Sequence, residues 1–150
     1  ISNIFNFLLD ISFDYSGGIL AFIENFDEFV KGENIDKSML CNEISSGGSE
    51  LNSLNIIKYK FLSYKNSSIA DIPHSSLLEL TRMDGATIVK QDDLSLVTCG
   101  FIMQNVEPCS YGGGRTAAAC SLSKYGYSFK ISEDGKITLF VNKKLCFTIN

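Results

Sequence analysis

A glycine-rich segment that leads into an alanine-rich one is the part of the sequence best suited to chemistry. Residues 112–119 read GGGRTAAA. Glycine lets a backbone turn sharply and approach a ligand closely, and the alanines predict a helix over residues 115–124. The first turn of a helix presents unpaired N–H groups and a partial positive charge, which together bind anions. The segment therefore predicts an anion site that includes Gly112, Gly113, Gly114, Arg115 and Thr116.

Arg115 is the most informative residue of this segment. A cation in the first turn of a helix opposes the helix dipole, at a cost of about 0.3–1 kcal/mol. We therefore expect an anion beside Arg115, and its planar guanidinium suits a phosphate. The alternative is an ordinary glycine turn whose arginine pairs with a carboxylate of the protein, because glycine-rich turns before helices are common.

A second short motif, Asp84-Gly85-Ala86, lies where a leucine-rich helix is expected to meet a strand. A carboxylate in that place can hold Mg²⁺ or Mn²⁺ beside a phosphate, so Asp84 is the candidate metal ligand. In the alternative interpretation, Asp84 caps a turn and Gly85 supplies an unusual backbone angle.

Apolar periodicity predicts the elements that must position these motifs. Helices are expected over residues 4–11 and, from a start at Asp71 and Pro73, through Leu80. A buried strand is expected over residues 19–23, and two hairpins and an edge strand over residues 86–103, 127–141 and 145–149. Residues 25–50 are expected to form a loop or short strands, and residues 51–61 have apolar residues at helical spacing.

Composition narrows the class of protein. The chain has 150 residues, 45% of them hydrophobic and 20% charged, which fits one globular domain. A net charge of −4 without a basic stripe argues against binding the backbone of DNA or RNA. The apolar start is too short to span a bilayer, so we expect no membrane segment within residues 1–150. Because the chain begins at Ile1 rather than Met, we expect it to be part of a longer protein.

The cysteines indicate a reducing compartment. Their number, five, is odd, and no C-x-x-C pair occurs. We therefore expect a cytoplasmic protein without a disulfide framework. We also expect no zinc site, because the chain has one histidine and no zinc-ligand spacing. Cys99, Cys120 and Cys146 lie in apolar runs, where a free thiol is expected to pack as a small hydrophobic group.

Together, the order and context of the two motifs resemble the diadenylate cyclase domain. That family carries Asp-Gly-Ala and, further on, Gly-Thr-Arg-His-Arg-Ala-Ala; residues 84–86 match the first in full and residues 113–119 match the second in part. Ser123 falls where the family's helix has a serine, and Ser132-Glu133 and Gly135 are similar to its following Ser-Glu and Gly. Residues 18–23 are similar to its first buried strand. The resemblance is clear from Leu77 to Val141.

The resemblance implies a single α/β domain over residues 1–150, with a mixed central sheet flanked by helices. It also implies a nucleotide site to which Ser123 and Glu133 contribute. The family's histidine is Thr116 here and its second arginine is Ala117, and in the family those side chains engage the phosphates and the metal of ATP. Their loss removes charge stabilisation where an in-line phosphoryl attack needs it. His74 lies before both motifs and does not replace the histidine.

Three functions stay open on this basis. The leading hypothesis is a nucleotide-sensing domain without catalysis, which binds an adenine nucleotide with Mg²⁺ or Mn²⁺ through Asp84 and Arg115. The second is an active diadenylate cyclase that makes cyclic di-AMP from ATP, with Asp84 as a catalytic residue, and this would require homodimers. The third is a protein-interaction module with a vestigial pocket.

Overall fold

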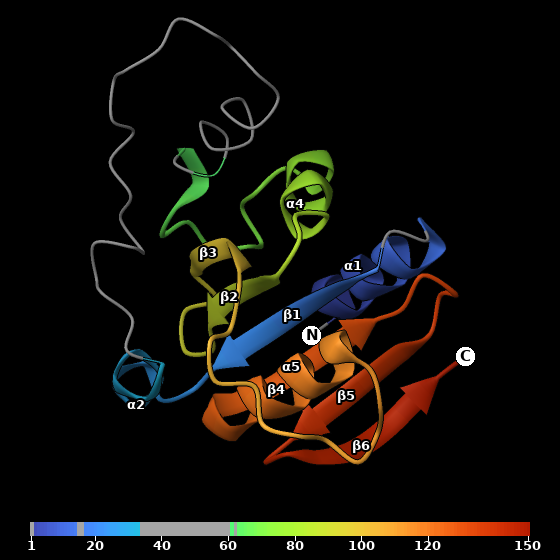
Figure 1. The fold of residues 1–150 in the computed structure, drawn as a ribbon. Helices are drawn as coiled ribbons and strands as arrows, with labels where there is room; N and C mark the ends of the chain where they lie inside the picture. The colour runs from blue at the N-terminus through green and yellow to red at the C-terminus, as the bar shows by residue number, and fades with distance from the viewer. Residues whose placement is uncertain (1, 15–16, 34–60, 62) are drawn as a thin grey trace, which may run out of the picture.

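The structure, a computed structural model, describes residues 2–14, 17–33, 61 and 63–150. Its centre is a six-stranded mixed sheet with the strand order β3-β2-β1-β4-β5-β6 (Figure 1). The strands are β1 Gly18–Ile23, β2 Ala86–Lys90, β3 Leu96–Phe101, β4 Gly126–Ile131, β5 Ile137–Val141 and β6 Lys144–Ile149. Strands β1 and β2 are parallel, and the other neighbouring pairs are antiparallel.

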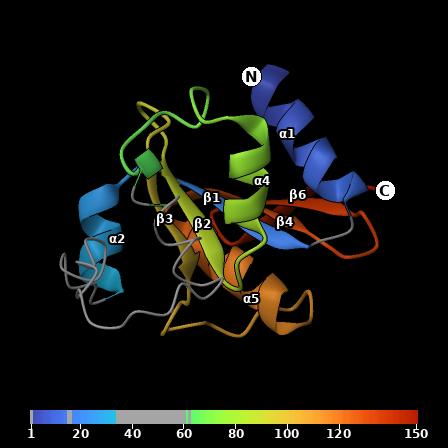
Figure 2. The same cartoon turned by 90° about the horizontal axis from the view of Figure 1, so that it is seen from above.

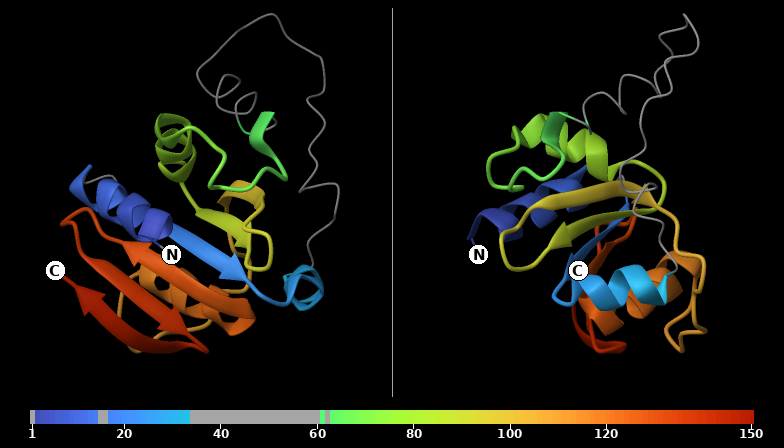
Figure 3. Two further views of the ribbon diagram at one scale, coloured as in Figure 1. Left: turned by 180° about the vertical axis from the view of Figure 1, so that it is seen from behind. Right: turned by 90° about the vertical axis from the view of Figure 1, so that its left-hand side faces the viewer.

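Helices cover both faces of this sheet. They are α1 Ser2–Phe13, α2 Phe26–Gly32, α4 His74–Thr81 and α5 Gly114–Leu122, and the short 3₁₀ helix η2 Ser123–Tyr125 follows α5 directly. The views from above and from the side show α1 and α4 on one face and α5 on the other (Figures 2 and 3). The fold is therefore α/β, with a mixed central sheet flanked by helices, as the resemblance to the diadenylate cyclase domain implies.

Two hydrophobic clusters lie on the opposite faces of the sheet. One contains Leu20 and Phe22 of β1 with Leu8 of α1 and Leu80 of α4, and it lies beneath α1 and α4. The other contains alternate β1 residues, among them Ala21, with apolar residues of α2 and α5. Side chains alternate across a strand, and each face of β1 is covered by one of these two clusters. All six residues of β1 are therefore buried, which confirms the prediction of a strand covered on both faces.

The largest correction to the predicted elements concerns residues 25–50. Residues 26–32 form helix α2, where a loop or short strands were expected. The signal was present in the sequence, because the Asn25 side chain accepts a hydrogen bond from the Glu28 N–H at 3.2 Å and caps the helix. Acidic residues in the first turn add favourable charge at this end. Residues 34–50, and residues 51–60 with their helical spacing, lie outside the described residues.

Other differences are small. Strand β3 begins at Leu96 and ends at Phe101, within the hairpin expected over residues 86–103. Helix α5 ends at Leu122, before residue 124 where it was expected to end, because the chain tightens into η2. Cys146 is exposed on the edge strand β6, so its expected burial is wrong. In the described part of the chain, no helix is long and apolar enough to cross a membrane.

Candidate functional site

The N-terminus of α5 is built as the glycine-rich segment predicts. Gly113 is the N-cap residue with φ 72° and ψ 147°, a left-handed conformation that glycine adopts without strain. Within the described part of the chain, no side chain caps this end. Ala119 and Leu122 bury the far side of the helix against the sheet, which fixes its direction. Gly114 and Arg115 at this end are exposed, and the N–H groups of a first helical turn have no partner within the helix.

Arg115 already has an anionic partner in the protein. Its Nη1 lies 2.8 Å from Oε1 of Glu133, in the turn after β4. The two side chains are 50% and 70% exposed. An ion pair this open contributes about 0.2–1 kcal/mol, so a multiply charged phosphate can compete with the Glu133 carboxylate for the guanidinium.

A shallow cleft of about 560 Å³ lies beside this ion pair. Its lining consists of the start of α5 and the end of β4 with the following turn: Gly113, Gly114, Arg115, Thr116, Lys130, Ile131, Ser132, Glu133 and Asp134. Lys130 brings a second cation to the cleft, and the sequence analysis did not single it out. Lys130 lies on the face of β4 that α5 covers, because the Ser128 hydroxyl donates a hydrogen bond to Ala119 O in α5 and side chains two residues apart share a face.

A smaller pocket of about 160 Å³ adjoins the cleft and brings the two sequence motifs together. Asp84, Gly85 and Ala86 form one side of this pocket, and Gly114 and Arg115 form another. The remaining lining is apolar: Ile19, Phe101, Ile102, Met103, Val106, Ala118 and Leu122. Arg115 borders both the cleft and the pocket, so a ligand with a charged end and an apolar end can contact it from either side.

Gly85 fixes the backbone beside Asp84. Its φ is 106°, and a Cβ built there would lie 2.7 Å from the Gly100 carbonyl carbon and from Phe101 O of β3. Strand β3 can therefore approach this turn only over a glycine. The close approach holds Asp84, which is exposed, at the mouth of the pocket.

Two of the predicted site residues are not part of this arrangement. Ser123 is fully buried, and its hydroxyl donates to Cys120 O at 2.7 Å and accepts from the Lys143 N–H at 2.9 Å. Ser123 therefore joins η2 to the β5–β6 turn and is not placed to contact a ligand, which corrects the expectation from the resemblance. Gly112 is exposed and lies outside the lining of both the cleft and the pocket.

The acidic residues offer limited support for a metal. Among the described residues, no group of three or more histidine, cysteine, aspartate or glutamate side chains could hold a metal ion. Among the described residues that line the small pocket, Asp84 is the one acidic residue. Mg²⁺ commonly binds through one or two carboxylates together with phosphate oxygens and water, so the residues present fit an ion that arrives with a nucleotide.

Comparisons with known proteins bear on the fold. Neither a protein-family model nor a curated protein sequence matches the chain. Among solved structures, a hypothetical membrane spanning protein from Bacillus cereus superimposes with a TM-score of 0.59 at 19% identity, over 99% of this chain and 62% of that one. A double mutant of DacA, a diadenylate cyclase from Staphylococcus aureus, superimposes with a TM-score of 0.55 at 13% identity, over 99% of this chain and 85% of that one. At these identities the likeness shows a diadenylate-cyclase-like fold.

Proposed function

We propose that this chain is a nucleotide-binding sensor domain that takes an adenine nucleotide and does not turn it over. The observation that carries the proposal is that Asp84 and Arg115, from separate parts of the chain, line one pocket at the N-terminus of α5. The diadenylate-cyclase-like fold supports the same ligand class. The domain would act in the cytoplasm and report occupancy of the pocket through its own change on binding.

The lining suggests how the nucleotide would lie. The phosphates would take the N–H groups of the first turn of α5, the Arg115 guanidinium and the Lys130 ammonium group, all at the cleft. The adenine would occupy the apolar part of the small pocket, beside Ile102 and Val106. Asp84 would contact the ribose or a Mg²⁺ or Mn²⁺ ion that accompanies the phosphates.

The absence of turnover rests on two positions of α5. Thr116 and Ala117 stand where the resembled family has a histidine and a second arginine. Thr116 is 8% exposed, and neither side chain can supply the positive charge that phosphoryl transfer requires. A pocket that has Asp84 and Arg115 but lacks the family's histidine and second arginine is what we expect of a receptor that binds the nucleotide without reacting with it.

Calorimetric titration with ATP and Mg²⁺ tests the proposal. We expect saturable binding by the wild-type chain. Arg115→Ala should weaken the affinity about 10- to 100-fold, because a hydrogen bond to a charged group contributes about 1.5–3 kcal/mol. Arg82→Ala is the matched control: it removes the same charge from the other arginine of the chain, which pairs with Asp14 and lines neither the cleft nor the pocket. Absence of heat with ATP, ADP and AMP would refute the proposal.

An active diadenylate cyclase is the second candidate, favoured by the fold shared with DacA. It would require homodimers, in which two nucleotides face each other. Mass spectrometry after incubation of concentrated protein with ATP and Mn²⁺ separates the two candidates. Intact ATP is the result expected for a sensor, whereas cyclic di-AMP formed by the wild type and not by Arg115→Ala would make the chain an enzyme.

A further inference from the structure

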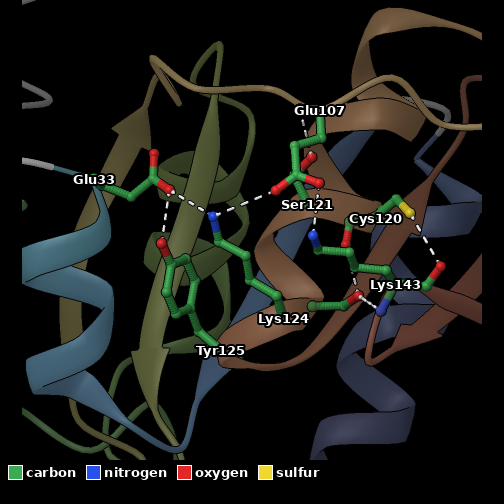
Figure 4. Close-up of polar contacts among 8 residues, drawn as sticks. Glu33, Glu107, Cys120, Ser121, Lys124, Tyr125 and Lys143 are labelled. Carbon is green, nitrogen blue, oxygen red and sulfur yellow. Dashed lines mark hydrogen bonds and ion pairs between the residues drawn. The ribbon is translucent and has the colours of Figure 1, made fainter.

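The loop of residues 102–113 connects β3 to α5, and part of it lines the small pocket. Polar contacts hold this loop against α5. The Glu107 N–H donates to the Ser121 hydroxyl at 3.0 Å, and the Lys143 ammonium group donates to Glu107 Oε2 at 2.6 Å (Figure 4). Lys124 approaches the other Glu107 oxygen at 3.9 Å. These contacts fix residue 107 beside residue 121. Cys109 lies two residues further along this loop, Cys120 lies one residue earlier in the helix, and Cys109 packs against the hydrophobic cluster that contains Cys120.

The two thiols share one environment. Cys120 is 6% exposed and belongs to the hydrophobic cluster beneath α5, and Cys109 is half-buried and packs against the same cluster. The Cys120 thiol lies 3.4 Å from Lys143 O, to which it donates (Figure 4). Burial and, next, interaction with the Cys109 side chain raise the pKa of Cys120 to about 11. Both side chains therefore pack in the same hydrophobic cluster, with Cys109 the more accessible of the two.

We propose that Cys109 and Cys120 form a reversible disulfide when a hydroperoxide oxidises the chain. The peroxide transfers one oxygen to the Cys109 sulfur, which becomes a sulfenic acid as water or an alcohol leaves. The Cys120 sulfur then attacks that sulfenic sulfur, the sulfenic hydroxyl leaves as water with the proton of the Cys120 thiol, and the S–S bond forms. Thiols restore both cysteines by exchange. Cys109 lies in an irregular segment, whose backbone can shift to bring the sulfurs to the bonding distance of about 2.05 Å.

The bond would connect two walls of the small pocket. Ile102 and Val106 come from the loop that carries Cys109, and Arg115 and Ala118 come from the helix that carries Cys120. A disulfide between these elements would restrict their relative movement whatever the pocket binds. The site is thus a modification site whose chemistry is independent of the nucleotide.

The other described cysteines serve as internal comparisons. Cys99 packs against the hydrophobic cluster on the opposite face of the sheet, and burial raises its pKa to about 12. Cys146 is exposed on β6. Neither shares the environment of Cys109 and Cys120. Selective linkage of Cys109 with Cys120 is therefore a specific expectation of this arrangement.

Peptide mapping of the wild-type chain tests the proposal. The folded protein is treated with hydrogen peroxide at low protein concentration, free thiols are alkylated, and the digest is analysed by mass spectrometry. We expect the Cys109 and Cys120 peptides joined, with a loss of two hydrogen atoms from their summed mass, and their separation after treatment with a reductant. Alkylated Cys120 beside Cys109 that is oxidised to a sulfinic acid, or linkage of Cys109 to other cysteines in comparable amount, would overturn the proposal.

Two matched variants exclude linkage through unfolded chains. The triple variant Cys41→Ser, Cys99→Ser, Cys146→Ser retains the proposed pair, and we expect it to form the intramolecular bond as the wild type does. The triple variant Cys41→Ser, Cys120→Ser, Cys146→Ser instead retains Cys109 and Cys99, which pack against clusters on opposite faces of the sheet. We expect no intramolecular bond in this variant. Equal linkage in both variants would show that proximity in the folded state does not select the pair.

Discussion

At the scale of single residues, the account depends on Arg115 and its exposed contact with Glu133. The guanidinium is 2.8 Å from the carboxylate, and both side chains are largely open to solvent. The sequence left two interpretations of Arg115, a phosphate ligand or a partner for a protein carboxylate. The structure supplies the carboxylate, and the proposal requires a phosphate to compete with it.

The Glu133→Gln substitution distinguishes these roles. If Glu133 only occupies Arg115 in the empty cleft, its neutralisation should free the guanidinium and raise ATP affinity by about 1.4- to 5-fold, since an exposed ion pair contributes about 0.2–1 kcal/mol. Calorimetric titration of the variant measures this change. Weaker binding would instead indicate that Glu133 contacts the nucleotide or its metal, as the resemblance implies.

The contact between Glu107 and Lys143 leads to a prediction of how the stability of the fold depends on pH. The hydrogen bond from Lys143 and, next, the charge of Lys143 lower the pKa of Glu107 from its ordinary value of 4.5. A carboxyl whose pKa is lower in the folded state stabilises that state above its ordinary pKa, and the contribution is lost as pH falls through the folded-state pKa. Urea unfolding of Glu107→Gln should therefore show lower stability than the wild type near pH 7. The difference should shrink as the pH falls from 4.5 through the folded-state pKa, and a difference that does not shrink as the pH falls would contradict the assignment.

At the scale of elements, the site is positioned by two tight backbone features, the turn at Gly85 and the N-terminus of α5. Gly85 has a positive φ and lies directly against the backbone of β3. Gly114 is also in the site, but its position has open space and helical geometry. The same substitution should therefore have opposite effects at these two glycines.

The predicted pair is Gly85→Ala and Gly114→Ala. Gly85→Ala should lower the free energy of unfolding by more than about 1 kcal/mol, because the new Cβ meets Gly100 and Phe101 and φ is unfavourable. Gly114→Ala should raise it by about 0.4–1 kcal/mol, because alanine restricts the unfolded chain without a clash. Denaturant unfolding of both variants measures the two values. A Gly85→Ala variant as stable as the wild type would show that the turn can relax away from β3.

At the scale of the whole molecule, β1 joins the two hydrophobic clusters, and its burial on both faces makes the sheet the organising core. Phe22 in this strand is fully buried, and its ring stacks on Tyr127 at 4.8 Å between centroids. By contrast, Phe147 on the edge strand β6 is 42% exposed. The two phenylalanines should differ strongly in their contribution to stability.

Phe22→Ala should lower the free energy of unfolding by about 3–5 kcal/mol, the usual cost of removing a buried phenylalanine. Phe147→Ala should cost clearly less, because part of its ring is already in water. Thermal and denaturant unfolding followed by circular dichroism compare the two. Similar losses would mean that β6 is covered in solution and that its apolar face is part of an interface.

Much of this architecture could be predicted because local signals agree with it. The six-residue apolar run of β1, the Asp134-Gly135 turn and the Ala-rich helix each carry a strong local pattern, and all three elements are found. Helix α2 was missed, although Asn25 and the acidic residues after it form an N-cap signal. Its few apolar residues gave no periodicity long enough to outweigh the scattered charges around them.

The site itself could be predicted only in part, because its contacts join distant segments. The resemblance placed Asp84 and Arg115 in one site, and the structure brings them to one pocket. The Arg115–Glu133 pair, the position of Lys130 at the cleft and the apolar wall at Ile102 depend on how α5 lies across the sheet, which no local pattern contains. Ser123 shows the converse, because a residue that matches by position is buried in a structural role.

The central claim is that an adenine nucleotide binds between Asp84 and Arg115. Titration of isotopically labelled protein with ATP and Mg²⁺, followed through backbone amide chemical shifts, tests it most directly. The account predicts the largest shifts at residues 84–86 and 113–116, with smaller ones at residues 102–106 and 130–133, and saturation that is lost in Arg115→Ala. Shifts centred elsewhere, such as the apolar groove between α1 and β6, or no shifts at high ATP concentration, would contradict it.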